Sequence, residues 1–391
     1  MTDVVICGAK RTPMGGFQGE LSSLAAPDLG ATAIRGALDE AGADGAAIDE
    51  TLMGIVLPAG VGQAPARQAS LGAGLPLSTP ATAISKVCGS GMQAVIQGAT
   101  QILAGHASLV VAGGMESMSN APYLSPATRA GARLGHARML DHMFLDGLED
   151  AYEGGLMGSF AETCAGAYDF SRAAQDAYAI ASLDRARAAT EAGILAAEIA
   201  PVTVTTRKGA ATIATDEQPR NARPEKIPML KPAFARDGTV TAANASSISD
   251  GAAALVLAAD AAAADRGLPV RARIRGFAGH AQEPGWFTTA PIGATRKLLD
   301  RLGWRTADVD LWEVNEAFAV VAMAFMQDLD IDHDRLNVHG GACALGHPIG
   351  ASGARILVTL LNAMEQRKVK RGIAAICIGG GEALAVALER G

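Results

Sequence analysis

The chain has 391 residues, of which 49% are hydrophobic, 4% are aromatic and 46 are glycine, and its formal net charge is −7. This length predicts about two or three domains with sizeable cores, and the glycine-rich, aromatic-poor composition favours an α/β protein. The acidic balance argues against a nucleic-acid-binding protein, which usually carries a basic patch.

The cysteines and the apolar segments indicate where the chain functions. The five cysteines are odd in number, scattered and free of any C-x-x-C pair, which favours a reducing compartment. The N-terminal sequence MTDVVICGAKRTP enters a strand-like run without an apolar or arginine-rich presequence. The most apolar stretch, AAALVLAADAAAA, is interrupted by Asp260 and is too short to cross a bilayer. We therefore predict a soluble, cytoplasmic protein with no membrane partner.

The first part of the chain predicts strands that alternate with helices. In order, these are an apolar run at Val4–Gly8, an amphipathic stretch around Leu29–Leu38, the run Ile48–Gly54, a glycine-rich turn at Cys88, an apolar helix and the run Leu109–Ser117. Such alternation indicates βαβ units with buried parallel strand pairing.

Between residues 118 and 248 the pattern changes. This region has charged helical segments, one capped by Ser171 and running to about Gly193, and the proline-rich sequence RPEKIPMLKP. We interpret it as an excursion from the first part, and the apolar run Ala252–Ala258 as the strand that returns to it. A separate domain between two linkers is the alternative interpretation.

The last part of the chain repeats the order of the first. It has a strand-like run at Arg271–Gly279, a helical segment around Ile292–Leu302, the run Val309–Asn315, a glycine-rich turn at His347–Arg355, a helix and the run Ala374–Ala383. In each part the final run ends in a glycine pair and a glutamate, namely Gly113, Gly114 and Glu116, and Gly380, Gly381 and Glu382. This internal similarity predicts two pseudo-symmetric halves. The predicted domains are 1–117 with 249–269, the insertion 118–248, and 270–391.

Reactive side chains occupy equivalent places in the two halves. Cys88 and His347 each precede a glycine-rich helix start, Cys377 ends a strand, and Asn315 ends the run before the His347 turn. Such junctions are where α/β folds usually place ligands.

These residue types suit acyl transfer from thioesters. A helix N-terminus favours the thiolate of Cys88, and the glycines around it allow substrate to approach and leave N–H groups for an oxyanion. His347 can take the proton of the nucleophile, and Cys377 can act as a second acid or base.

Two other interpretations remain open at this point. The sequence GSGMQA matches the dinucleotide fingerprint G-x-G-x-x-A, but the next strand ends in glycine where an acidic residue is expected. A papain-like protease also uses cysteine, histidine and asparagine, but here Asn315 precedes His347 and the local signature is missing. No cysteine and histidine spacing indicates zinc or another metal.

The motifs closely resemble those of the thiolase family. VCGSGMQA, GGMESMS, NEAF, GGACALGHPIGASGAR and CIGGG follow the family's order across nearly the whole chain. The resemblance implies an α/β fold with two βαβαβαββ halves in a five-layered αβαβα arrangement and an inserted loop domain that binds coenzyme A. It also implies a homo-oligomer, dimer or tetramer, with the tetramer favoured, and coenzyme A as co-substrate with no tightly bound cofactor.

The resemblance assigns a role to each matching residue. Cys88 matches the nucleophile that becomes acylated, His347 its base, Cys377 the acid/base that acts on the acetyl-CoA α-carbon, and Asn315 the residue that holds a water. Asn315 with its water and His347 form one oxyanion hole, and the amides of Cys88 and Gly379 form the other. The predicted coenzyme A and substrate contacts are Ser246 on the pantetheine, Arg220 near the nucleotide, and Leu156, Met157, Phe287 and Phe318.

Three departures from the family's common pattern concern the substrate. His339 replaces an asparagine in NVHGG, Leu156 replaces a histidine before Met-Gly, and Phe287 replaces a methionine. The resemblance favours biosynthetic-type, short-chain members, which interconvert two acetyl-CoA with acetoacetyl-CoA and coenzyme A. The departures keep open a broader 3-ketoacyl-CoA thiolase of fatty-acid breakdown. A non-catalytic acyl-CoA-binding relative is disfavoured because Cys88, His347 and Cys377 are all present.

Overall fold

The computed structural model describes residues 2–206 and 209–391, and two similar halves occur within them. The first half contains β1 (Val4–Arg11), β2 (Gly15–Gly16), α1 (Ala26–Ala41), β3 (Glu50–Gly54), α2 (Pro65–Gly72), β4 (Ala81–Ile84), α3 (Ser90–Leu103), β5 (Leu109–Ser117), β10 (Ser249–Ala259) and α7 (Asp260–Arg266). The second half contains β11 (Ala272–Ala281), α8 (Ala290–Leu302), β12 (Leu311–Val314), α9 (Ala319–Leu329), α10 (Ala342–Leu345), α11 (Ile349–Gln366), β13 (Arg371–Ile378) and β14 (Glu382–Glu389). The predicted alternation of strands and helices is confirmed in both halves.

Strand pairing follows one scheme in the two halves. The sheet has the order β4-β3-β5-β10-β1 and continues through β11 as β11-β14-β13-β12. The pairs β3–β4, β3–β5 and β12–β13 are parallel, whereas β10 and β14 run antiparallel to both of their neighbours. Parallel neighbours need long crossover connections, and helices provide them in each half.

Register shifts at corresponding places in β1 and β11 also indicate duplication. β1 shifts against β10 between Ile6 and Gly8, and β11 shifts against β14 between Ile274 and Gly276. A bulge bends a strand and increases its twist, so each half bends at the corresponding place. The halves differ at one edge, because an isolated bridge between Trp312 and Leu336 stands where the first half has β4.

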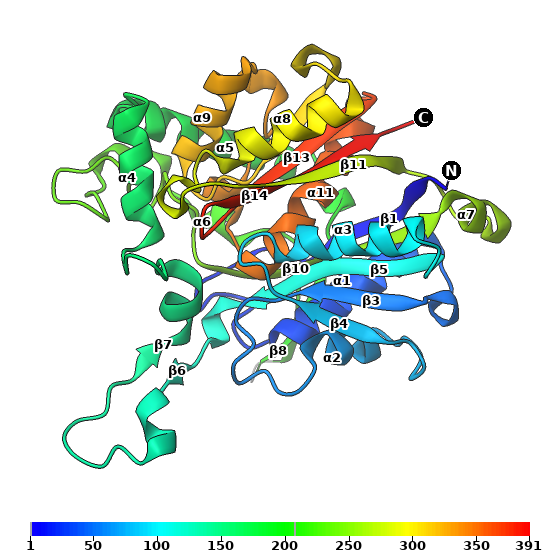
Figure 1. Ribbon diagram of the computed structural model, residues 1–391, viewed down its shortest axis with the longest axis horizontal. Helices are drawn as coiled ribbons and strands as arrows, with labels where there is room; N and C mark the ends of the chain where they lie inside the picture. The colour runs from blue at the N-terminus through cyan, green and yellow to red at the C-terminus, as the bar shows by residue number, and fades with distance from the viewer. Residues whose placement is uncertain (1, 207–208) are drawn as a thin grey trace.

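Helices and sheets form the five layers that the resemblance implies. Helices α3 and α11 lie in the middle, α1 and α2 cover the outer face of the first half, and α8 and α9 cover that of the second (Figure 1). In the central core Met92 of α3 and Leu357 of α11 pack with Leu255 of β10 and Ile376 of β13. The central helices are therefore shared by both halves.

Glycine lets the two central helices cross at backbone contact. A Cβ atom on Gly91 would lie 2.9 Å from the backbone nitrogen of Ala354, and one on Gly353 would lie 2.5 Å from that of Met92. Real Cβ atoms essentially never approach other heavy atoms this closely. The crossing brings the N-terminal turns of α3 and α11 together, and these follow Cys88 and His347 respectively.

The two glycine pairs that the sequence comparison equated occupy different structures. Gly113 and Gly114 lie inside β5, where Cβ atoms would overlap the carbonyl oxygens of Ala253 and Gly350. Gly380 and Gly381 form the turn between β13 and β14, with φ of 87° and 84°. The predicted equivalence of the pairs is therefore wrong, because the first allows close packing and the second a left-handed turn.

The chain leaves the first half after β5 and returns with β10. The segment between them contains β6 (Tyr123–Leu124), β7 (Leu140–Asp141), α4 (Met157–Ala167), α5 (Arg172–Glu191), β8 (Val202–Thr206), β9 (Gly209–Ile213) and α6 (Glu217–Asn221). As predicted, Ser171 caps α5, its hydroxyl accepting a hydrogen bond from the Ala174 N–H at 3.2 Å. An arm that carries β6 and β7 extends away from the rest of the molecule (Figure 1).

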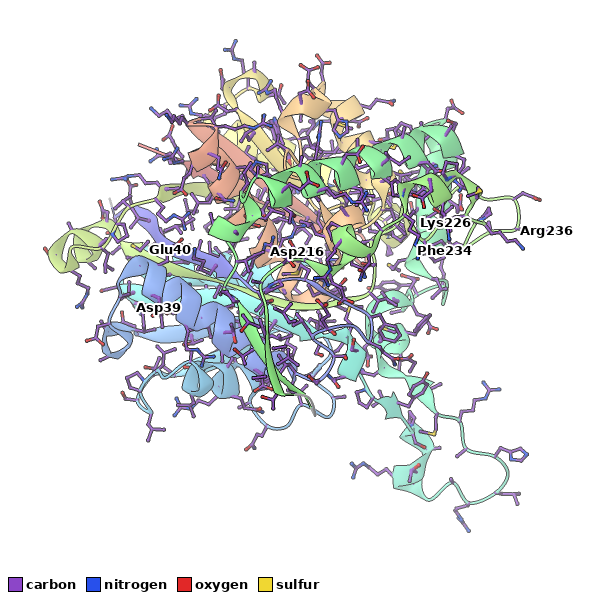
Figure 2. The ribbon with its side chains drawn as sticks, turned by 180° about the vertical axis from the view of Figure 1, so that it is seen from behind. Asp39, Glu40, Asp216, Lys226, Phe234 and Arg236 are labelled. Atoms are coloured by element: carbon purple, nitrogen blue, oxygen red, sulfur yellow. The ribbon has the colours of Figure 1, made fainter. Side chains whose placement is uncertain are left out.

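Buried ion pairs connect the insertion to the first half. The guanidinium of Arg11 on β1 donates to Glu198 at 2.5 Å and to Asp216, labelled in Figure 2, at 2.7 and 2.9 Å. All three side chains are buried, and removing one partner of such a network costs about 3–5 kcal/mol. Across residues 2–206 and 209–391, no helix combines the length and apolar character that a membrane span requires.

Candidate active site

The Cys88 turn connects β4 to α3 and is held in an unusual conformation. Val87 has φ of 46°, a left-handed conformation that a β-branched residue rarely adopts. Ser90 fixes the turn, since its hydroxyl donates to the Val87 carbonyl at 2.6 Å and accepts from the Lys86 N–H at 2.8 Å. Strain at a turn that presents a reactive side chain is typical of functional sites.

The thiol of Cys88 lies against the turn that follows β13. The backbone N–H groups of Gly379 and of Cys88 itself lie near the sulfur and lower the pKa of the thiol, and the charge of Cys88 raises the pKa of Cys377. The structure thus brings together Cys88, Cys377 and Gly379, which come from different halves.

Burial keeps both cysteines in the thiol form. It raises the pKa of Cys88 to about 11, and the nearby charge of Glu116 adds to this rise, whereas the two N–H groups oppose it. Burial also raises the pKa of Cys377 well above its ordinary value. The prediction that the helix N-terminus favours a Cys88 thiolate is therefore wrong: α3 begins only at Ser90, and burial raises the pKa of the thiol.

The glycines that follow Cys88 lie in tightly packed surroundings. A Cβ atom on Gly89 would overlap the Ile378 side chain, and Gly91 lies at the crossing of α3 and α11. By contrast, a Cβ atom on Gly379 would lie 3.6 Å from both Met157 Sδ and Val87 Cγ1, an ordinary contact distance. A side chain at either position that follows Cys88 would meet protein atoms, so packing alone requires glycine there, and the role of these glycines in substrate access stays a prediction.

His347 is a buried base with one ring nitrogen engaged. Its Nδ1 lies 2.6 Å from the hydroxyl of Ser352 on α11. Its Nε2 is buried and has no hydrogen-bond partner among the residues that the structure describes. Burial, assisted by the charge of Arg355, lowers the pKa of His347 to about 3, so the imidazole is neutral near pH 7.

Asn315 presents an unsatisfied amide at the end of β12. Its backbone N–H donates to Ala375 of β13 at 3.0 Å, which fixes the residue in the sheet. Both Oδ1 and Nδ2 are buried and lack partners within the described part of the chain. Buried amide groups are normally hydrogen-bonded, so this arrangement has the capacity to hold a water molecule.

The predicted substrate contacts gather from several elements. Ser246 donates its backbone N–H to Ala317 at 2.9 Å, beside a bridge between Ala245 and Phe318. Phe318 and Phe287 are in edge contact, with ring centroids 6.3 Å apart. The structure therefore places Ser246 next to the NEAF loop.

The insertion adds two aromatic rings to this region. Phe160 of α4 lies 6.4 Å from Phe287, and Phe234, labelled in Figure 2, lies 6.0 Å from Phe318, between ring centroids. Met157 packs against the same cluster, which also contains Cys377. Leu156, the residue before α4, is partly buried.

Two predicted residues have other surroundings. Arg220 on α6 is half exposed and forms an ion pair with Glu20 at 2.6 Å. His339 is buried, its pKa is lowered by that burial, and its Nδ1 has no partner within residues 2–206 and 209–391.

Sequence reasoning missed Glu116 as a site residue. Its buried carboxylate accepts N–H groups from Val56 at 3.0 Å, Leu57 at 3.2 Å and Gly350 at 2.8 Å. Burial raises its pKa to about 7. Because Gly350 lies in the first turn of α11, Glu116 ties β5 to the helix that follows His347. The motif GGMES contains this glutamate, but nothing in the sequence indicates its partners in the other half.

Comparison with known proteins identifies the family of this chain. The family described as "Thiolase, N-terminal domain" matches residues 4–261, and "Thiolase, C-terminal domain" matches residues 268–390. The chain belongs to the thiolase family.

Similar proteins cover the chain from end to end. An acetyl-CoA acetyltransferase of Pseudomonas aeruginosa is 50% identical over the whole of both chains. Acetyl-CoA acetyltransferase 1 of Arabidopsis thaliana is 50% identical over 99% of this chain and 94% of its own length. The crystal structure of a thiolase from Ascaris suum in complex with coenzyme A has a TM-score of 0.93 and 44% identity, and covers 99% of this chain and 100% of its own. The predicted thiolase fold is confirmed.

Proposed function

We propose that the chain interconverts acetoacetyl-CoA and coenzyme A with two acetyl-CoA through an acyl-cysteine at Cys88. The observation that carries this proposal is the convergence of the Cys88 thiol, the Gly379 amide and Cys377. The name of the relatives from Pseudomonas aeruginosa and Arabidopsis thaliana supports the choice of an acetyl group.

In the thiolysis direction both cysteines start as thiols, which agrees with their raised pKa values. Nε2 of His347 takes the proton of Cys88, and the sulfur attacks the ketone carbon of acetoacetyl-CoA. The carbon–carbon bond breaks, and the enolate of acetyl-CoA takes the proton of Cys377. The products of this step are acetyl-CoA, acetyl-Cys88, protonated His347 and the thiolate of Cys377.

The second step restores the enzyme. Coenzyme A gives its thiol proton to Cys377, and its sulfur attacks the acetyl-Cys88 carbonyl. The bond to Cys88 breaks, and the released sulfur takes the proton from His347, so the proton count balances. Condensation is the reverse of these two steps.

Two groups of donors are suited to the developing negative charges. The N–H groups of Cys88 and Gly379, which lower the pKa of the Cys88 thiol, are our candidates for donors to the oxyanion of the tetrahedral intermediate. A water on the unsatisfied amide of Asn315, together with His347, is suited to the enolate oxygen. Removing one such donor typically lowers the rate by 10²–10³.

A broader 3-ketoacyl-CoA thiolase is the second candidate. Phe160, Phe234, Phe287 and Phe318 are in edge contact with one another, and Met157 packs against the hydrophobic cluster to which they belong. An apolar wall of this kind, with Leu156 in place of the family's histidine, favours longer acyl chains than a polar one would. Catabolism of fatty acids would then be the physiological setting.

A chain-length series tests both candidates. Wild type and Cys88→Ala would each receive 3-ketoacyl-CoA substrates of increasing length together with free coenzyme A. We expect the highest kcat/KM with acetoacetyl-CoA and a loss of roughly 10⁴-fold or more in Cys88→Ala. A preference for long chains would support the second candidate, and turnover in Cys88→Ala would refute the assignment of the nucleophile.

The remaining proposals follow from the family resemblance. We infer two catalytic halves, 1–117 with 249–269 and 270–391, and an inserted domain 118–248 that binds coenzyme A through Ser246 and Arg220. We also infer a cytoplasmic homotetramer that uses coenzyme A as co-substrate without a tightly bound cofactor. The crystal structure of the Ascaris suum thiolase with coenzyme A supports the co-substrate.

A further inference from the structure

The ring of His347 is held at one nitrogen only. Its Nδ1 meets the Ser352 hydroxyl at 2.6 Å, whereas Nε2 is buried and without a partner among the described residues. The backbone before α11 supports the residue without touching the ring, because the His347 N–H donates to the Ser247 carbonyl at 3.1 Å. The orientation of the imidazole therefore depends on Ser352.

The hydroxyl of Ser352 has a second contact that determines the direction of the first. Its Oγ lies 2.9 Å from the Pro348 carbonyl oxygen, one helical turn earlier. A carbonyl oxygen only accepts hydrogen bonds, so the single hydroxyl hydrogen of Ser352 is directed to Pro348. The lone pairs of Oγ are then left to accept a hydrogen from Nδ1 of His347.

We propose that Ser352 is a positioning residue that holds His347 in the Nδ1–H tautomer and so leaves the lone pair on Nε2 free to accept a proton. The inference rests on the proposed function only where it concerns catalysis, since the tautomer is a property of the resting protein. In the other tautomer Nε2 would carry hydrogen and would be unable to take the proton of Cys88.

A serine and a carboxylate differ as partners of a catalytic histidine. A carboxylate at Nδ1 would favour the imidazolium, whereas Ser352 is a neutral acceptor. The positive charge of Arg355 further disfavours the imidazolium. Ser352 thus supplies orientation without favouring protonation, and the imidazole of the resting protein stays neutral.

Substitution of Ser352 tests the proposal with two readouts. ¹⁵N NMR of histidine-labelled protein would report the tautomer of His347, and mass spectrometry after rapid mixing with acetyl-CoA would report the rate at which Cys88 is acetylated. In Ser352→Ala we expect a rise in the Nε2–H tautomer and a 10- to 100-fold slower acetylation, part of the roughly 10²–10⁴ that a positioned base provides. Ser352→Thr keeps the hydroxyl and should restore both readouts.

A matched control distinguishes the positioning of His347 by Ser352 from the general effect of removing a buried hydroxyl group. Thr359 lies on the same helix, is fully buried and donates to Glu198 at 3.0 Å. Thr359→Val should leave the tautomer unchanged and acetylation within about twofold of wild type. An unchanged tautomer in Ser352→Ala, or an equal slowing in Thr359→Val, would overturn the proposal. If the wild type forms no acetyl-Cys88, the proposed function fails, while the tautomer still tests Ser352.

Discussion

The turns before α3 and α11 occupy equivalent places in the two halves but provide different environments. Cys88 is partly exposed, whereas His347 is 6% exposed. The helices differ in the same sense: α11 is buried at every residue from Ile349 to Met364, while α3 keeps an exposed face that ends in Leu103. The two equivalent positions therefore differ in burial, and the Cys88 side chain is the more exposed of the two.

The connection between the last two strands shows the same divergence. In the second half three glycines, Gly379–Gly381, join β13 to β14 and present an amide to Cys88. In the first half the corresponding connection is the long segment from β5 to β10, which carries Met157 and the aromatic rings of Phe160 and Phe234. The short turn thus contributes a backbone donor beside Cys88, whereas the long insertion contributes apolar side chains to the core of the second half.

The helix crossing that joins the halves should be the most sensitive feature. In Gly353→Ala the added Cβ would lie 2.5 Å from the Met92 nitrogen, which forces α3 and α11 apart. We expect a loss of about 3 kcal/mol or more in the free energy of unfolding, measured by urea denaturation, together with loss of activity.

Gly166→Ala is the matched control for this substitution. Gly166 lies in the last turn of α4, and a Cβ atom there would have no neighbour within 4 Å among the described atoms. This variant should be neutral or up to about 1 kcal/mol more stable, because alanine favours the helix. Equal stability of Gly353→Ala and wild type would contradict the described crossing.

The two turns should also differ in how they respond to acid. The folded pKa of His347 is about 3, below the ordinary 6.5, so the unfolded chain binds the proton first. Stability conferred by the neutral ring therefore falls as pH decreases from 6.5 towards 3. Relative to His347→Gln, the wild type should lose up to roughly 2.7 kcal/mol between pH 7.5 and pH 4.5.

Cys88→Ala tests the equivalent position in the other half. The pKa of the Cys88 thiol is about 11, so it does not titrate in this acid range. Thermal unfolding of the three proteins across pH 4.5–7.5 should show a changed pH dependence for His347→Gln only. Parallel curves for His347→Gln and wild type would mean that folding leaves the pKa of His347 at its ordinary value.

The sequence was sufficient to predict the alternation of strands and helices, although α2, β4 and α9 were missed and the single predicted run Ala374–Ala383 is divided between β13 and β14. The apolar faces of α3 and α11 follow helical periodicity, and the repeated order placed Cys88 and His347 at equivalent turns. Helical periodicity is a local pattern and the duplication is a repeat within the chain, so both can be recognised from a single sequence.

The unpredicted features depend on contacts between the halves. The Cys88 pKa is set by burial and by Glu116, and the need for Gly91 arises from Ala354 on another helix. Neither is encoded within a short window. The similar spacing of Gly113, Gly114 and Glu116 and of Gly380, Gly381 and Glu382 led to a wrong equivalence for the same reason. Residues with the same spacing along the chain have different neighbours in the folded protein.

The different surroundings of Glu116 and Glu382 can be measured as a difference in their contribution to stability. Glu116 is buried and accepts three backbone N–H groups, whereas the Glu382 side chain is 41% exposed and pairs with Lys86. At pH 5, Glu116→Ala should lower the free energy of unfolding by about 2 kcal/mol, since it leaves buried donors unsatisfied. Glu382→Ala should lower it by less than about 1 kcal/mol, as is usual for exposed ion pairs.

The pH dependence of the Glu116 effect sharpens the contrast. Its folded pKa of about 7 exceeds the ordinary 4.5, so the folded protein binds the proton more tightly than the unfolded chain. The stability that this provides is complete below pH 4.5 and is lost as pH rises through 7. The destabilisation caused by Glu116→Ala should therefore shrink between pH 5 and pH 8, as followed by urea denaturation at each pH. A constant difference would show that Glu116 is ionised throughout, and that its three N–H donors outweigh burial.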